Sequence, residues 1–133
     1  MELAELQTLK KLLKELTPVI KEEQNSHIVE ENSYTRIYYN GATLAKHVDR
    51  KGLDLTLSLC TFSNLKKPWE LHVQVEKGKV LSFDTKPGDG ALILGTKMLH
   101  WRDPLICAED EYVIQSFYHW KINGDIKKVK MFI

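Results

Sequence analysis

Leucines recur at helical spacing along the first part of the chain. Glu and Lys lie among them, and the stripe is formed by Leu3, Leu6, Leu9, Leu13 and Leu16. Because residues three and four positions apart share one face of a helix, this pattern predicts an amphipathic helix that packs on a core. Thr17-Pro18 is expected to interrupt it, and a turn or two over residues 19–23 would complete a helical lead-in of about residues 1–24.

From Ser33 onward the pattern changes to short segments rich in aromatic and β-branched residues. Turn sequences such as Asn40-Gly41 and Lys77-Gly78 separate these segments, which is typical of strands joined by tight turns. The expected strands are residues 34–39, 43–48, 53–61, 70–75, 80–83, 91–94 and 112–122, with 126–132 as a candidate for one more. Residues 76–79 predict a tight hairpin.

Residues 53–60 alternate strictly between leucine and a smaller or more polar side chain. This alternation predicts a strand with one apolar face and one more polar face. Seven or eight short strands after a helical segment favour a mainly β (α+β) fold, a double-stranded β-helix of the cupin-like jelly-roll kind with the N-terminal helix packed outside. The chain has 133 residues and no repeat or linker, so we expect one domain over residues 1–133.

Charge and cysteine usage narrow the function. The 19 basic residues nearly balance the 18 acidic ones, so no overall field favours a nucleic acid or a membrane surface as partner. Residues 1–5 lack the basic start and apolar run of a secretory signal. Cys60 and Cys107 are too few for a disulfide framework and lack metal-site spacing, which favours a reducing cytoplasm.

The tripeptide His47-Val48-Asp49 carries the strongest chemical signal. In an extended strand alternate side chains share a face, so His47 and Asp49 are aimed at one point. His100, which follows the turn Pro87-Gly88-Asp89-Gly90 and a short apolar strand, is the candidate third ligand. Two imidazoles and one carboxylate leave several metal positions open, an arrangement typical of non-haem Fe(II) oxygenases. Alternatively, the two histidines are ordinary half-buried strand residues that hydrogen-bond to Asp49 and to the backbone.

These pieces, in this order, resemble the Fe(II)- and 2-oxoglutarate-dependent dioxygenases, in particular the group similar to prolyl 4-hydroxylases and AlkB-type demethylases. The resemblance covers roughly residues 34–120 and includes Gly41 before His47, the Pro87-Gly88-Asp89 turn and the spacing from His100 to Pro104-Leu105. It implies that His47, Asp49 and His100 hold Fe(II), that 2-oxoglutarate is the cosubstrate, and that no catalytic side chain is needed beyond the ligands.

The match fails at the residue that anchors the far carboxylate of 2-oxoglutarate. Relatives place an Arg or Lys there, whereas this chain places Glu111 near that position, where its charge would repel a dicarboxylate. Arg36 and Tyr38, which share a strand face, are the first candidates to bind the cosubstrate instead, since a guanidinium pairs well with a carboxylate. The amide of Gln115 is another possible donor. Arg102 is the second candidate anchor and, with Trp101, a candidate for substrate contact.

The resemblance implies hydroxylation of an unactivated C–H bond, on a peptidyl (prolyl-type) or amino-acid substrate. A second hypothesis is a cupin-like β domain that binds a metal or a small anion and has no oxygenase activity. A third is a β domain without a metal. The remaining histidines, His27, His72 and His119, are interpreted as structural or solvent-facing, although His119 could face the barrel interior. The sequence does not indicate an oligomeric state.

Overall fold

One helix and eight strands make up the described part of the chain, residues 3–24 and 27–123 of the computed structural model. The helix is α1 (Leu3–Gln24), and a short 3-10 turn, η1 (Glu76–Gly78), joins two of the strands. The strands are β1 (His27–Tyr38), β2 (Leu44–His47), β3 (Leu55–Ser63), β4 (Leu71–Gln74), β5 (Val80–Phe83), β6 (Gly90–Ile93), β7 (His100–Arg102) and β8 (Val113–Asn123). The candidate strand over 126–132 lies outside the described residues.

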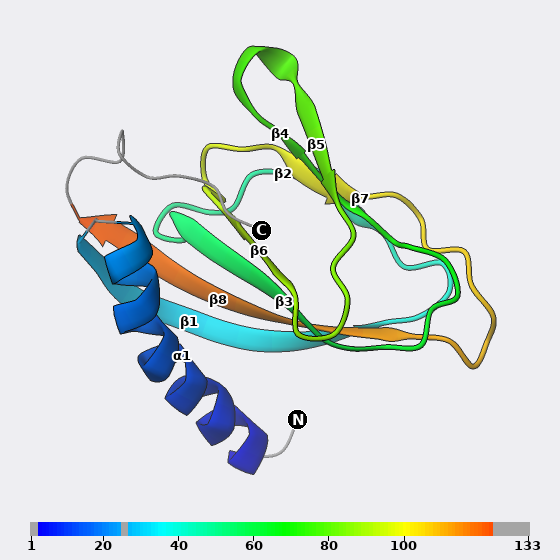
Figure 1. The fold of residues 1–133 in the computed structure, drawn as a ribbon, viewed down its shortest axis with the longest axis horizontal. Coiled ribbons are helices and arrows are strands. Elements are labelled where there is room, and N and C mark those ends of the chain that lie inside the picture. The colour runs from blue at the N-terminus through cyan, green and yellow to red at the C-terminus, as the bar shows by residue number, and fades with distance from the viewer. Residues whose placement is uncertain (1–2, 25–26, 124–133) are drawn as a thin grey trace.

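The strands form two antiparallel four-stranded sheets. One has the order β1-β8-β3-β6 and the other β2-β7-β4-β5. The sheets face each other, and α1 lies on the outer side of the first sheet (Figure 1). This is the double-stranded β-helix that the sequence predicts, with the helix outside it. The predicted hairpin at residues 76–79 is also confirmed, because η1 joins the antiparallel pair β4 and β5, and Lys77 and Gly78 take left-handed conformations there.

Helix α1 continues through Pro18, so the predicted interruption at Thr17-Pro18 is wrong. The Thr17 hydroxyl donates to the carbonyl of Leu13 over 2.6 Å, and the indole N–H of Trp120 donates to Thr17 over 2.8 Å. Proline removes one backbone donor from a helix, but tertiary packing maintains this one. Leu13 and Ile20 of the helix pack against buried apolar side chains of the first sheet, namely Ile28, Leu55, Leu92, Tyr118, Trp120 and Ile122.

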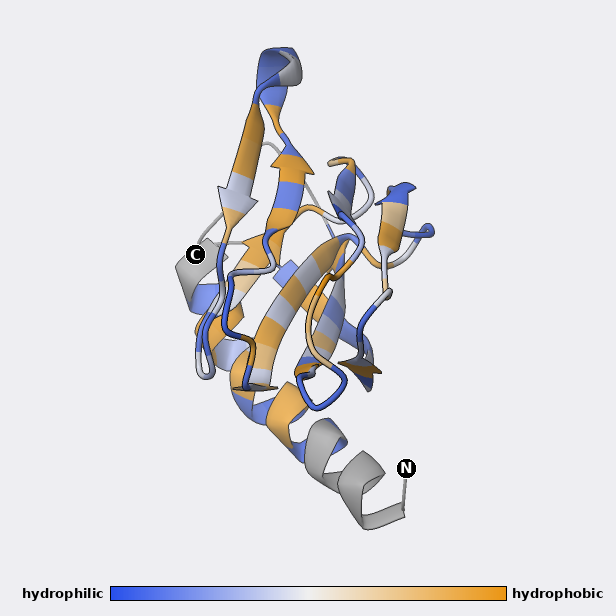
Figure 2. Ribbon diagram, turned by 90° about the vertical axis from the view of Figure 1, so that its right-hand side faces the viewer, coloured by the Kyte–Doolittle hydropathy of each residue, from blue (hydrophilic) through white to orange (hydrophobic). Residues whose placement is uncertain are grey.

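The long strands of the first sheet carry two different faces. Leu55 packs toward the helix, while Thr56 and Ser58 lie on the opposite face and are also buried. Figure 2 shows this alternation as bands of hydrophobic and hydrophilic colour along the strands. The two predicted faces are confirmed, and the more polar one is the inner face of the barrel. A polar interior requires hydrogen-bonding partners, and it is here that the candidate site lies.

Two strands differ from the sequence prediction. β1 begins at His27 rather than residue 34, because its polar first half pairs with the far end of β8, from His27 opposite Asn123 onward. β7 was not expected as a strand, since three residues are too few to show a period. Cys60 and Cys107 are free thiols, and the helix that the structure describes is not apolar enough to cross a membrane. The single domain over residues 1–133 stays a prediction.

Candidate metal centre

His47 and His100 are direct partners on neighbouring strands. His47 is the last residue of β2, His100 is the first of β7, and the two pair across the antiparallel ladder. Asp49 follows two residues after His47, and its backbone N–H donates to the carbonyl of Gly95 over 2.8 Å. The structure thus brings together the three side chains that the sequence suggested as metal ligands.

The three side chains meet at one point. The Nε2 atoms of His47 and His100 lie 3.4 and 3.2 Å from Oδ1 of Asp49, and one candidate ligand atom from each residue lies within 4.8 Å of the others. Imidazole nitrogens and carboxylate oxygens bind a divalent ion at about 2.1 Å, which places adjacent ligand atoms about 3 Å apart. The observed spacing therefore fits a single divalent ion.

Backbone contacts set the tautomer of both histidines. Nδ1 of His47 lies 2.6 Å from the carbonyl oxygen of Ala45, and Nδ1 of His100 lies 2.8 Å from that of Met98. Because a carbonyl oxygen only accepts, each Nδ1 carries a hydrogen, so the neutral form of each imidazole keeps its lone pair on Nε2. The lone pairs therefore face the point where the side chains meet, as metal-binding imidazoles require.

Asp49 is held as a carboxylate. The hydroxyl of Thr56 donates to Oδ2 over 2.8 Å, which leaves Oδ1 to face the two imidazoles. Burial by itself would raise the pKa of Asp49, but the hydrogen bond and positive charge that a protonated His100 provides, together with the Thr56 hydrogen bond, outweigh burial and lower it. Oδ1 is therefore available as an anionic ligand at neutral pH.

A small cavity of about 90 Å³ opens beside these three residues, between the inner faces of the two sheets. Three of the residues that line it are candidates for cosubstrate or substrate contact from the sequence: Arg36, Tyr38 and Arg102. Polar and aromatic residues that the sequence did not indicate as part of the site also line the cavity, namely Tyr34, Thr56, Ser58, Phe117 and His119.

Arg102 is a buried cation without a carboxylate partner. Its side chain is 2% exposed, Nη1 donates to the carbonyl of Trp69 over 2.7 Å, and Nη2 has no hydrogen-bond partner. Within residues 3–24 and 27–123, no Asp or Glu forms a salt bridge with it. Burial lowers the pKa of Arg102 to about 10. An unpaired buried guanidinium is unfavourable, so this part of the cavity is suited to an anion.

Tyr38 and Arg36 occupy different depths of the same strand face. The hydroxyl of Tyr38 is buried without a partner, and burial raises its pKa although the charges of Arg36 and Arg102 oppose this. Arg36 is exposed, and its guanidinium carbon lies 5.5 Å from the ring centre of Tyr34. The sequence ranked Arg36 above Arg102 as the carboxylate anchor, whereas the structure buries Arg102 and leaves Arg36 at the rim.

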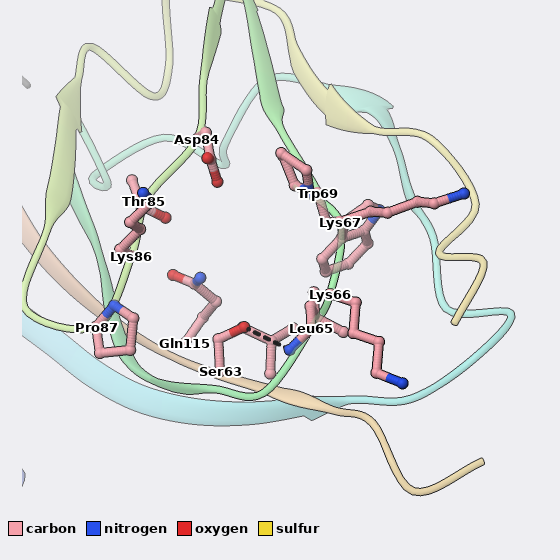
Figure 3. Close-up of a pocket in the computed structure, with 12 residues that line it drawn as sticks. Ser63, Leu65, Lys66, Lys67, Trp69, Asp84, Thr85, Lys86, Pro87 and Gln115 are labelled. Atoms are coloured by element: carbon pink, nitrogen blue, oxygen red, sulfur yellow. Dashed lines mark hydrogen bonds between the residues drawn. The ribbon is translucent and has the colours of Figure 1, made fainter. Parts of the chain in front are cut away.

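Two further candidates do not line the cavity. Gln115 is buried, its Oε1 accepts a hydrogen bond from Ser58 over 3.2 Å, and its amide points into a separate groove of about 400 Å³ (Figure 3). Trp101 lies between two inward-facing residues of β7, so its own side chain is on the outer face, under the ammonium of Lys46 at 4.3 Å. Trp101 therefore does not line the cavity beside the metal ligands, and its contact with a substrate stays a prediction.

Glu111 is not on the inner face of the barrel. It precedes β8, lines another surface groove, and its Oε2 accepts from the backbone N–H of Lys66 over 3.4 Å. The expected repulsion between Glu111 and a ligand in the cavity is therefore wrong. Glu111 lies in the loop before β8, so its carboxylate does not face the cavity.

Comparison with known proteins supports the fold. No family model and no curated protein matches the chain. The similar solved structures include a prolyl-4-hydroxylase from Pseudomonas putida (15% identity, TM-score 0.63, covering 82% of this chain and 63% of that one). A 2OG-Fe(II) oxygenase family oxidoreductase from Burkholderia pseudomallei has 8% identity, a TM-score of 0.61 and coverage of 72% and 46%. The nickel complex of the non-heme monooxygenase ThoJ has 12% identity, a TM-score of 0.59 and coverage of 80% and 49%.

At these identities the likeness concerns the fold alone. The chain spans less than two thirds of the length of each of these proteins. Its structural neighbours include members of the 2OG-Fe(II) oxygenase family, and the site carries the donor atoms of a metal centre.

Proposed function

We propose that this chain is an Fe(II)- and 2-oxoglutarate-dependent dioxygenase domain that hydroxylates an unactivated C–H bond. One observation carries the proposal: a single cavity combines a two-histidine, one-carboxylate donor set with a buried arginine whose Nη2 is unpaired. The donor set is typical of non-haem Fe(II) oxygenases. The arginine supplies the charge that a dicarboxylic cosubstrate needs.

One group of residues in the site would bind the metal, and another would bind the far carboxylate of the cosubstrate. Fe(II), when bound, would supply chelation of the 2-oxo acid and activation of dioxygen. His47, Asp49 and His100 would hold the ion through Nε2, Oδ1 and Nε2, and their backbone and Thr56 hydrogen bonds keep these atoms aligned. No side chain has to act as a nucleophile or a general acid.

Arg102 and Tyr38 would bind the far carboxylate of 2-oxoglutarate. Nη2 of Arg102 and the hydroxyl of Tyr38 are both buried donors without partners, and both line the cavity. A carboxylate placed between them would satisfy two donors and neutralise a buried cation. This assignment replaces the missing basic residue on the last strand with one from β7.

The main substrate would bind at the mouth of the cavity rather than inside it. A cavity of about 90 Å³ suits a small cosubstrate. The side chain of His47 is 36% exposed and that of His100 only 6%, so the metal site opens on the His47 side. We propose a peptidyl or amino-acid side chain as the substrate, supported by the fold likeness to a prolyl-4-hydroxylase and by the near-neutral net charge. A cytoplasmic location is likewise a proposal, drawn from cysteine usage.

An anaerobic titration tests this function. Protein loaded with Fe(II) is titrated with 2-oxoglutarate, and we expect the visible charge-transfer absorption of a 2-oxo acid chelate. Succinate, which lacks the 2-oxo group, should give no such band, and Asp49→Asn should abolish it. Succinate formation from 2-oxoglutarate, stimulated by proline-containing peptides, would then identify the substrate class.

The alternative function is a cupin-like domain that binds a metal or a small anion without oxygenase activity. The same donor set and the same unpaired Arg102 would serve it. In that case Fe(II) binds, but 2-oxoglutarate produces no charge-transfer band and no succinate forms. Failure to bind any divalent ion would contradict the oxygenase function and the metal-binding form of the alternative, and would leave only binding of a small anion.

A further inference from the structure

A hydrogen-bonded chain joins a second buried histidine to the proposed metal ligand Asp49. His119 lies on β8, is 2% exposed, and stacks on Tyr34 with ring centres 5.5 Å apart. Its Nδ1 lies 2.9 Å from the hydroxyl oxygen of Thr56, and the same hydroxyl donates to Oδ2 of Asp49 over 2.8 Å. One hydroxyl group thus connects the imidazole with the carboxylate.

The direction of each hydrogen bond follows from the donor inventory. A carboxylate only accepts, so the single hydroxyl hydrogen of Thr56 goes to Asp49. The hydroxyl oxygen can then only accept from His119, which requires the hydrogen of the neutral imidazole to sit on Nδ1. Burial lowers the pKa of His119 to about 4, so the ring is neutral near pH 7. Nε2 of His119 therefore carries a lone pair.

That lone pair has no partner within the described part of the chain. Nε2 of His119 is buried, and His119 lines the cavity beside the three proposed metal ligands. Asn32, which pairs with His119 across β1 and β8, has a buried Oδ1 that is also without a partner, but Asn32 does not line the cavity. An unpaired buried acceptor is unfavourable, so Nε2 of His119 is suited to a hydrogen-bond donor.

We infer that His119 is a positioning residue that acts through Thr56 to orient Asp49. The inference rests on the proposed metal site, because it concerns how that site is supported. Partners of this kind usually change metal affinity by 10- to 100-fold when removed.

The relay is tested with Mn(II) alone, measured by isothermal titration calorimetry. Thr56→Val and His119→Leu should each weaken Mn(II) binding by about 10- to 100-fold. Thr56→Ser keeps the hydroxyl and His119→Asn keeps an N–H near the Nδ1 position, so both should bind within about threefold of the unaltered protein. If His119 acts through Thr56, the double variant should be no weaker than the poorer single variant.

Thr35→Val is the matched control. Thr35 of β1 hydrogen-bonds to Ser116 of β8 over 2.9 Å and does not line the cavity, so its loss should leave Mn(II) binding unchanged. Near-ultraviolet circular dichroism of each metal-free variant confirms that it is folded. His119→Leu that binds Mn(II) as well as the unaltered protein, or additive losses in the double variant, would overturn the relay.

The tautomer is tested on the unaltered protein without any metal. Long-range ¹⁵N–¹H correlation spectra should show the His119 hydrogen on Nδ1 and a bare Nε2, and hydrogen on Nε2 would overturn the inference. The Nε2 shift should not change in Asn32→Ala, since a change would mean that the Asn32 amide already fills this acceptor. If the unaltered protein binds no Mn(II) at all, the proposed metal site itself fails, which is distinct from a failure of the relay.

Discussion

The carboxylate of Asp49 occupies the space that a side chain on Gly95 would need. A Cβ built on Gly95 would collide with Oδ2 of Asp49 and lie 2.9 Å from its Cγ, and it would lie 2.8 Å from the hydroxyl oxygen of Thr56. The backbone at Gly95 is not left-handed, unlike that of Gly41 or Gly88. Glycine is therefore required here by close approach to the metal site and not by backbone conformation.

Gly95→Ala should displace the Asp49 carboxylate and weaken Mn(II) binding by at least about tenfold, because a ligand that shifts loses its alignment. Calorimetric titration with Mn(II) measures this. Gly41→Ala is the control, since Gly41 has φ +87° and no atom lies within 4 Å of the point that a Cβ would occupy there. It should lower the free energy of unfolding by about 1–2 kcal/mol and leave Mn(II) binding intact. Equal Mn(II) affinity in Gly95→Ala and the unaltered protein would contradict the argument.

Arg102→Met should remove 2-oxoglutarate binding while it leaves Mn(II) binding in place. Truncating one partner of a buried charge pair costs about 2–5 kcal/mol, so affinity for 2-oxoglutarate should fall at least about 30-fold. The ligand-free protein should not lose stability by the same amount, because the deleted cation has no carboxylate partner in the protein. Calorimetry with 2-oxoglutarate on the Mn(II)-loaded protein, together with urea unfolding, measures both effects.

Arg36→Gln is the comparison for that experiment. Arg36 lines the same cavity but is exposed, so water already solvates its charge. Its loss should weaken 2-oxoglutarate binding by less than about tenfold. If Arg36→Gln is the more harmful of the two changes, Arg36 is the anchor, as the sequence suggested.

Local periodicity predicted the features that depend on neighbouring residues. The spacing of two in His47-Val48-Asp49 places both side chains on one strand face in any extended conformation. The alternation over residues 53–60 likewise predicted the two faces of β3, which the structure confirms. The order of strands and glycine turns was enough for the jelly-roll fold.

Features that depend on contacts between distant segments could not be predicted in this way. Arg102 becomes the buried cation of the cavity because β7 lies between β2 and β4, a pairing that three residues of sequence do not reveal. Gly95 looks like an ordinary turn glycine until Asp49 is placed beside it. For His119, the sequence left open an orientation toward the barrel interior, but only the hydrogen bond to Thr56 connects it with Asp49.

The stability of the metal-free protein should fall as the pH decreases from about 6.5 to about 4. The pKa of His119 is about 4 in the folded protein and near 6.5 when unfolded, so in this interval the unfolded chain binds more protons. The loss amounts to roughly 3 kcal/mol at most. The lowered pKa of Asp49 adds a further loss only below its unfolded value of 3.8. Urea unfolding at about pH 7 and about pH 4.5 measures the effect.

His119→Asn provides the control for that pH dependence. An amide does not titrate, so the variant should lose less stability between the two pH values than the unaltered protein does. The difference between the two proteins isolates His119 from the other titrating groups. Equal losses of stability in the two proteins would mean that folding does not lower the pKa of His119.

Pro18→Ala should stabilise the protein. Pro18 lies inside α1, where it removes the N–H that would bond to the carbonyl of Lys14, and its side chain is exposed. Proline in a helix interior is about 3 kcal/mol less favourable than alanine. Because the helix already continues through this position, part of that difference has been offset by packing, and we expect a gain of about 1–3 kcal/mol in urea unfolding.

Val19→Ala is the control for this change, since Val19 is 61% exposed and its replacement should alter stability by less than about 0.5 kcal/mol. A loss of stability in Pro18→Ala would mean that the proline shapes α1 so that Leu13 and Ile20, on either side of it, both reach the sheet. In that case the buried contacts of Ile20 in the apolar cluster would depend on the proline, and Ile20→Ala would cost less in the Pro18→Ala background than in the unaltered protein.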